Sequence, residues 1–384
     1  MGIDAIFNPH YWAAVPFHFW SLCFFLFGCV TGSFLNVCIH RLPLGMSIVT
    51  PRSHCPHCKY SIPWYLNLPL VTWVALRARC RNCGAPISPR YFIVELLTGL
   101  AFLGCWLAFG NTSHLLSSSA LAVVYCIFIS GLIAATFIDI EHLIIPDEIT
   151  LGGLGVGLFA SFFIPSLHGA TVLSAGLRRG FVGALVGAGV VYAVLRLGKW
   201  LFGRQRVKLP AGTRIVFGDS AVHLPGREIP YEDLFYRKTD VVVLQAETVE
   251  LVDRGYRDVP VRLSPFSLEI GEEKFKPEDV ACLEAVSAEV LLPREAMGLG
   301  DVKFMGAIGA FIGWQGVLFT LTISSMIGAF FGAAMVLLRR REWSGRLYFG
   351  PFIALAAALW IFAGPALVTW YQHLTDSLAL LWLR

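Results

Sequence analysis

Charged residues are scarce in this sequence. Only 15% of its 384 residues are Asp, Glu, Lys or Arg, whereas 56% are hydrophobic. Soluble globular domains carry about 25% charged residues. The composition therefore excludes an ordinary soluble protein and predicts a chain that crosses a membrane several times.

Positive charge is absent from the first part of the chain, and negative charge is absent from the part that follows. Residues 1–40 contain no Lys or Arg, while residues 41–90 contain Lys and Arg but no Asp or Glu. Cytoplasmic loops of membrane proteins are enriched in Lys and Arg, so we expect the amino terminus outside and 41–90 in the cytosol. No basic stretch precedes the first apolar run and no small residues follow it, which predicts a retained helix instead of a signal peptide.

Runs of about 17–25 apolar residues, the length that crosses a bilayer, recur along the chain. They cover 16–38, 91–110, 119–138, 150–167, 180–201, 317–338 and 349–370. A shorter apolar run at 303–316 adjoins the run at 317–338. The combined stretch 303–338 is interrupted at 313–316, which predicts a tight hairpin of two helices. We therefore predict about eight transmembrane helices with both chain ends outside. Arg178 and Arg179 then fall in an external loop, against the usual charge bias.

One segment, 202–297, differs from its surroundings because it is rich in charged residues. Apolar runs at 241–244 and 259–263 predict strands, and apolar residues at helical spacing in 277–290 predict a helix. Its content of Val, Leu, Phe and Tyr favours a folded cytosolic domain over a disordered linker. The expected fold is an all-α polytopic membrane protein with a β-rich or α+β insertion. Its predicted segments are a first transmembrane helix in 1–40, a small cytosolic zinc-binding domain in 41–90, transmembrane helices in 91–201 and 298–370, the cytosolic insertion in 202–297 and an external tail in 371–384.

Four of the ten cysteines form two Cys-x-x-Cys pairs in the predicted cytosolic domain. Cys55 and Cys58 make the first pair, Cys80 and Cys83 make the second, and 21 residues separate the pairs. A reducing cytosol disfavours disulfides, and two such pairs supply the four thiolates of a tetrahedral structural zinc site. We predict zinc bound by these cysteines, with no coordination position left open for catalysis. A redox dithiol pair is the alternative.

Two aspartates are expected at the cytosolic ends of membrane helices, where a carboxylate is costly and is therefore a functional candidate. Asp139 directly follows the third apolar run. Pro146 disfavours helix at Ile145, so we expect Asp139 on the last turns of this helix. Asp301 opens a later run, directly after Gly298 and Gly300. Two carboxylates at the same depth in the membrane could meet. They can then share a proton and act as general acid and base on an amide bond. The alternatives are a proton or cation relay in a transporter and, for Asp301, a simple helix cap.

The residues around these aspartates resemble one known family. Gly298-Leu299-Gly300-Asp301-Val302-Lys303, and the triplet Ile145-Pro146-Asp147 after Asp139, are similar to the motifs of the bifunctional type IV prepilin peptidases. The resemblance implies that Asp139 and Asp301 are the catalytic dyad of a membrane-embedded aspartic endopeptidase, with Gly298, Gly300 and Lys303 in its GxGD turn. It also implies a multi-pass protein of the bacterial inner membrane that cleaves prepilin or pseudopilin leaders at the cytosolic face.

Three more acids lie close to Asp139 in the sequence: Glu141, Asp147 and Glu148. We expect them to be secondary to the dyad. Acidic groups at the membrane edge would attract the basic stretch of a prepilin leader.

The amino-terminal part extends the resemblance. Gly32-Ser33-Phe34-Leu35-Asn36, then Arg41-Leu42-Pro43, the cysteine pairs, and Glu95 are similar to the region that this family associates with N-methylation of the cleaved product by S-adenosylmethionine. This makes Gly32, Asn36, Arg41 and Glu95 candidates for methyl transfer or leader recognition. Helix packing and snorkelling are the alternative roles, and no dinucleotide-type Gly-rich loop places the cofactor.

The function implied by the resemblance is leader cleavage followed by N-methylation. Zinc and S-adenosylmethionine are the expected cofactors, and prepilins and the lipid bilayer are the expected partners, with no nucleic acid among them. A proton- or cation-coupled transporter and a peptidase without methyltransferase activity are the alternatives.

Overall fold

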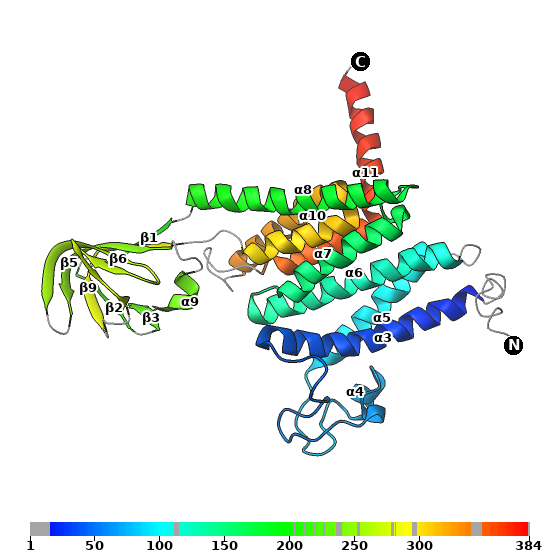
Figure 1. Ribbon diagram of the computed structural model, residues 1–384, viewed down its shortest axis with the longest axis horizontal. Helices are drawn as coiled ribbons and strands as arrows, with labels where there is room; N and C mark the ends of the chain where they lie inside the picture. Colours follow the sequence, from blue (N-terminus) through cyan, green and yellow to red (C-terminus); the bar gives the residue numbers. More distant parts are fainter. Residues whose placement is uncertain are drawn as a thin grey trace. The chain divides into compact units, whose positions relative to one another are not determined.

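Two compact units make up the protein in this computed structural model (Figure 1). One contains Met1–Val191 and Leu299–Arg384, and the other contains Tyr192–Gly298. The structure describes residues 16–382, apart from 111–114, 203, 211, 219, 226, 236–239, 252–253, 278–279, 281, 294–297 and 339–347.

Long helices build the first unit, as the apolar runs predicted. They are α3 (Phe17–Arg41), α5 (Pro89–Phe109), α6 (Leu115–His142), α7 (Asp147–Phe163), α8 (Leu173–Phe202), α10 (Leu299–Leu337) and α11 (Gly350–Trp382). Short helical turns lie between them: η1 (Leu42–Leu44), η2 (Trp64–Leu66), α4 (Val71–Ala75) and η4 (Pro165–His168). α11 continues through the expected tail at 371–384 as far as Trp382, so this segment is helical, and its place outside the membrane stays a prediction.

Five helices in the described part of the chain are long and apolar enough to cross a membrane, and a bent pair within α11 makes up to six. α10 counts as one of the five, and α7, with 17 residues, is not among them. The predicted helical membrane fold is therefore confirmed, while the count of eight spans stays a prediction. The placement of both chain ends outside also stays a prediction, and residues 1–15 and 383–384 lie outside the described residues.

A break inside α10 falls where the hairpin was predicted. Gly313 has φ 70° and ψ 175°, a left-handed φ that favours glycine. After the break, Phe319 packs on Trp360 and Phe331 packs on Phe352. The second half of α10 therefore runs antiparallel to α11.

The first half of α10 runs the other way. A Cβ placed on Gly153 would lie 3.6 Å from Ala307, and one placed on Gly157 would lie 2.8 Å from Ala310, so this half runs parallel to α7. Both α7 and α11 begin at the end of the bundle where α6 finishes. The two halves of α10 thus form the predicted hairpin.

Polar groups from the end of α7 and from η4 hold the hairpin turn. The Nε2 atom of His168 lies 2.8 Å from Oγ of Ser161 and 3.1 Å from the carbonyl oxygen of Ala310. Ser161 Oγ lies 2.9 Å from the same carbonyl oxygen. Burial lowers the pKa of His168, so this imidazole is neutral at pH 7 and has one N–H to donate.

Glycines bring helices into backbone contact. A Cβ on Gly28 of α3 would lie 2.8 Å from the Cα of Gly99 on α5, and a Cβ on Gly183 of α8 would lie 2.1 Å from the carbonyl oxygen of Gly309. Side chains at these positions would push the helices apart. Gly183 and Gly309 therefore let α8 and α10 approach each other at backbone distance.

In its described residues, the second unit is an antiparallel sheet of ten strands. β5 (Val242–Glu250) and β6 (Gly255–Leu263) are its longest, and they contain the two predicted strands. The main path of the sheet is β4-β3-β2-β9-β5-β6-β7-β8, and β10 pairs with both β1 and β5. The remaining elements are β1 (Arg204–Lys208), β2 (Arg214–Phe217), β3 (Ala221–Leu224), β4 (Arg227–Pro230), α9 (Tyr231–Leu234), β7 (Leu268–Ile270), β8 (Glu273–Phe275), β9 (Leu283–Val286) and β10 (Glu289–Pro293).

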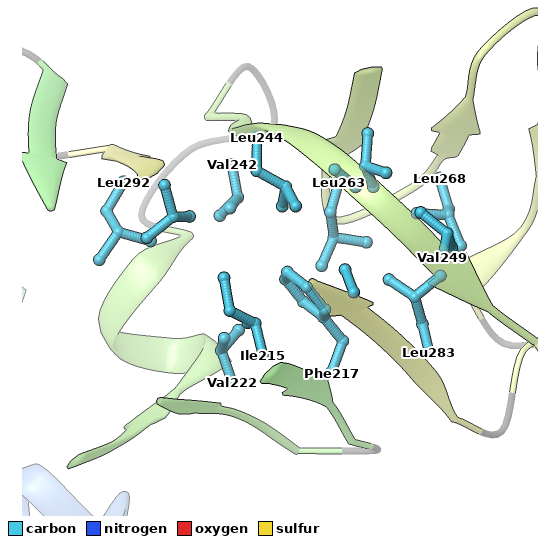
Figure 2. Close-up of a cluster of buried hydrophobic side chains, with 14 of the residues drawn as sticks. Ile215, Phe217, Val222, Val242, Leu244, Val249, Leu263, Leu268, Leu283 and Leu292 are labelled. Carbon is cyan, nitrogen blue, oxygen red and sulfur yellow. The ribbon is translucent and has the colours of Figure 1, made fainter. Parts of the chain in front are cut away.

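The helix predicted at 277–290 is wrong, because β9 and the start of β10 occupy its second half. Leu283 and Ala285 are buried on β9, and Val290 and Leu292 are buried on β10, a spacing of two along each strand. Figure 2 shows Leu283 and Leu292 in the same interior as side chains from β2 and β5. Strand pairing with β2 and β5 outweighs the helical spacing of the apolar residues.

Candidate active site

The loop between α6 and α7, residues 143–146, lies at the candidate site. α6 ends at His142, Leu143 has φ 57°, and α7 begins at Asp147 directly after Pro146. Proline cannot continue the preceding helix, but it fits directly before a new one. Asp139 therefore lies on the last turn of α6, as predicted.

The carboxylate of Asp139 is held by the start of another helix. Its side chain is buried, and Oδ2 accepts a 3.0 Å hydrogen bond from the backbone N–H of Gly350, the first residue of α11. The positive end of the α11 dipole thus faces an acid. Sequence reasoning missed Gly350; the Gly350-Pro351 pair at the start of an apolar run was the available signal.

Asp301 lies in the first turn of α10, which begins at Leu299, so the predicted Gly298-to-Asp301 turn is mostly helical. A Cβ on Gly300 would lie 3.7 Å from the Cβ of Ile145 in the α6–α7 loop. Asp139 lies before this loop, and the turn that carries Asp301 packs on it. The sequence predicted that these two segments meet, and the structure brings them to the same loop.

Two of the three neighbouring acids already have basic partners. Lys303 donates to Asp147 at 2.6 and 2.9 Å, and Arg90 at the start of α5 pairs with Glu141. These pairs hold α7 to α10 and α5 to α6. Glu148, the third acid, lines a groove instead.

This groove has a volume of about 330 Å³ and lies between α3, α6, α7 and α10. Of the described residues that line it, Glu148 alone is charged. The other lining residues are mostly apolar and include Leu35, Leu132, Gly152, Phe304 and Ile308. The groove can therefore hold an apolar chain next to one carboxylate.

The groove and the two aspartates share helix faces. Asp139 follows Leu132 by seven residues on α6, and Asp301 precedes Phe304 by three and Ile308 by seven on α10. Residues three, four or seven apart lie on one face of a helix. Each aspartate thus stands at the end of a face that lines the groove.

The four cysteines of residues 41–90, here named the tetracysteine domain, come together as predicted. The ligand atoms of Cys55, Cys58, Cys80 and Cys83 all lie within 4.8 Å of one another. Two knuckles, each with a turn at the second cysteine, place the thiols at the corners of a small cage. The set fits a tetrahedral metal ion such as zinc and fills all four corners.

Hydrogen bonds within the knuckles favour the thiolate at two of the four cysteines. The side-chain amide of Asn82, 3.5 Å from the sulfur of Cys58, and a backbone hydrogen bond at Tyr60 lower the pKa of Cys58 to about 6. Backbone N–H groups of the second knuckle lower the pKa of Cys80. A backbone hydrogen bond at Ala85 also lowers the pKa of Cys83, but desolvation and the neighbouring thiols outweigh it and raise that pKa to about 11. Thiolates are the form that binds zinc, so Cys58 and Cys80 are the two cysteines whose surroundings favour metal binding at neutral pH.

The other amino-terminal candidates bind this chain's own backbone. Asn36 Nδ2 lies 3.1 Å from the carbonyl oxygen of Tyr91, and a Cβ on Gly32 would lie 2.7 Å from the Cα of Glu95. Glu95 accepts a 2.7 Å bond from the N–H of Leu70. These three residues join α3, α5 and the tetracysteine domain.

Arg41, the last residue of α3, also binds backbone groups of the chain. Its guanidinium donates to the carbonyl oxygens of Ser47 and Pro51 at 2.9 and 2.7 Å, and it is buried. Burial excludes the snorkelling alternative for this residue. With their polar atoms on backbone groups, Arg41 and Glu95 do not offer a ready set of contacts for a cofactor.

Two family models match the chain. "Bacterial Peptidase A24 N-terminal domain" covers residues 26–109, and "Type IV leader peptidase family" covers 126–224 and 280–333. Together they match more than half of the chain. The gap at 225–279 lies inside the β-rich insertion, so that part of the insertion departs from the family pattern.

Similar proteins named prepilin leader peptidase/N-methyltransferase occur in several bacteria. One from Myxococcus xanthus is 43% identical over 190 residues, 46% of this chain and 55% of that protein. One from Aeromonas hydrophila is 28% identical over 384 residues, 93% of this chain and 95% of that protein, and one from Pseudomonas aeruginosa is 28% identical over 91% of this chain and 93% of that protein. No solved structure matches the chain.

Proposed function

The chain belongs to the type IV leader peptidase family, and we propose that it is a membrane-embedded aspartic endopeptidase that also methylates its product. Its substrates in this proposal are prepilins or pseudopilins, as the names of its full-length relatives indicate. The observation that carries the proposal is the arrangement of Asp139 and the Asp301 turn around one loop, at the end of an apolar groove.

The dyad needs one ionised and one protonated carboxyl group. Two carboxylates close together do not both ionise readily, so they share a proton. The ionised group takes a proton from water, and the protonated group donates to the scissile carbonyl. The N–H of Gly350 holds Asp139 in one orientation for this exchange.

The groove supplies the second requirement, a place for the substrate. An apolar segment of the substrate would lie along the faces of α6 and α10 that end at Asp139 and Asp301, so its end would reach the dyad. Glu148 would attract a basic stretch of the leader. Asp147 and Glu141 are secondary in this respect, because Lys303 and Arg90 already neutralise them.

In this proposal, the amino-terminal part of the chain, residues 26–109, carries the methyltransferase part of the function. Zinc at the four cysteines would be structural, because a closed set of four thiolates leaves no site for substrate. We assign Asn36, Arg41 and Glu95 to the scaffold of residues 17–109, since they hydrogen-bond backbone groups there. Gly32 joins them because a Cβ on it would lie 2.7 Å from the Cα of Glu95. S-adenosylmethionine would supply the methyl group.

The test is cleavage of a short prepilin by the full chain in lipid vesicles, followed by mass spectrometry. We expect Asp139→Asn and Asp301→Asn each to lower the cleavage rate by roughly 10²–10⁴-fold while the protein stays folded. A variant that keeps wild-type cleavage would refute the dyad. The same spectra report a methyl group on the new amino terminus, and its absence with the wild type would leave a peptidase without methyltransferase activity.

A further inference from the structure

A long uncharged stretch of the tetracysteine domain serves neither zinc binding nor the proposed dyad. Residues 61–76, here named the interfacial segment, contain no Asp, Glu, Lys, Arg or His, and Lys59 and Arg77 flank them. A stretch of this length is too short to span a bilayer. It is the length found in interfacial or re-entrant segments of membrane proteins.

The interfacial segment exposes large apolar side chains. Trp64 in η2 is 81% exposed, and Val71 and Val74 on α4 are 63% and 60% exposed. Tyr65 and Leu68 are exposed as well. Soluble domains rarely present such a patch, because burying large apolar side chains is favourable. A cover is therefore expected for this surface.

Two contacts fix the segment beside a membrane-spanning helix. The N–H of Leu70 donates to Glu95 at 2.7 Å, and the ring of Trp73 packs on Phe92 with centroids 5.2 Å apart. Phe92 and Glu95 lie in the first two turns of α5, itself a candidate span. The segment thus lies beside the start of the span.

α5 exposes apolar side chains of its own. Ile93, Leu97 and Leu100 are 50%, 44% and 51% exposed along that helix, as expected for residues that face lipid. Trp and Tyr are enriched where hydrocarbon meets headgroups, since each has an apolar body and a polar tip. A segment that exposes Trp64 and Tyr65 beside the start of this helix therefore fits the headgroup boundary.

Charges around the segment match an anionic bilayer. Lys59, Arg77, Arg79 and Arg81 are exposed, and residues 41–90 contain no acid. Basic residues near an anionic leaflet strengthen binding to it. Exposed apolar side chains and exposed cations in one short stretch of chain are the composition of a membrane-surface element.

We propose that the interfacial segment inserts into the boundary between headgroups and acyl chains of an anionic bilayer, and so docks the tetracysteine domain on the membrane. Lipid is the occupant, because the segment contacts the start of the membrane helix α5 through Phe92 and Glu95 and exposed basic residues flank it in the chain. The inference does not depend on peptidase activity.

The test uses the full chain in nanodiscs that contain phosphatidylglycerol. The photo-crosslinking residue p-benzoylphenylalanine replaces Trp64 or Val74 in separate variants, and Arg52, exposed in the same domain and outside the interfacial segment, serves as the matched control site. After irradiation, mass spectrometry of the digested protein counts lipid adducts. Retained zinc content checks that each variant has folded.

We expect adducts at positions 64 and 74 to exceed those at position 52 at least fivefold. Adducts equal to those at position 52, or none, would overturn the proposal. Crosslinks from position 64 to a second copy of the chain, or to an added prepilin, in place of lipid would overturn it too and would name the occupant.

Discussion

The contact between Gly350 and Asp139 gives the sharpest prediction. A Cβ on Gly350 would lie 2.7 Å from Oδ2, 3.1 Å from Cγ and 3.3 Å from Cβ of Asp139. Favourable non-bonded separations are about 3.5–4.0 Å, so Gly350→Ala must move the carboxylate by roughly 0.5–1 Å. That movement also stretches the 3.0 Å hydrogen bond from the Gly350 N–H.

A displacement of about 1 Å at a reacting group costs on the order of 100-fold in rate. We therefore expect Gly350→Ala to lower kcat for prepilin cleavage by about 10- to 100-fold with little change in KM, because the groove is untouched. The assay is steady-state cleavage by purified protein in vesicles, with the melting temperature measured alongside.

Gly332 provides the matched control. It also lies in a membrane helix, α10, but a Cβ placed on it meets nothing within 4 Å. Gly332→Ala should keep wild-type kcat. Full activity in Gly350→Ala, or equal losses in both variants, would refute the proposed role of Gly350 in positioning Asp139.

Three other predictions concern the zinc cluster, the groove and the hairpin turn. Metal analysis should find about one zinc per chain, lost in the double variant Cys55→Ser with Cys58→Ser; metal-free wild type that remains folded would contradict this. Gly152→Phe, at a groove position with free space around its Cβ, should raise KM on the order of tenfold with kcat retained, and an unchanged KM would argue against substrate in the groove. Burial lowers the pKa of His168, so protonation of this imidazole opposes folding, and the stability that neutral His168 contributes is lost as pH falls below about 6.5. His168→Gln should therefore lose less thermal stability than wild type between pH 7.5 and 5.5. Parallel losses in the two proteins would count against this.

The predicted acids illustrate how far residue chemistry reaches. Sequence reasoning marked Glu141, Asp147 and Glu148 as equivalent neighbours of Asp139. Their partners come from α5 and α10, more than 50 and 150 residues away in the chain. Ion pairs between distant segments follow from packing, so only the structure separates the two neutralised acids from Glu148 in the groove.

Local features of the sequence determined the helices, the Gly313 break and the cysteine cluster. Apolar run length, Pro146 and the Cys-x-x-Cys spacing act over a few residues, and each needs no knowledge of the rest of the fold. The tertiary structure alone decided that Gly350 holds Asp139, that the interfacial segment lies against α5, and that residues 283–293 form strands. Each of these depends on contacts between segments far apart in the chain, where partner geometry outweighs local preference.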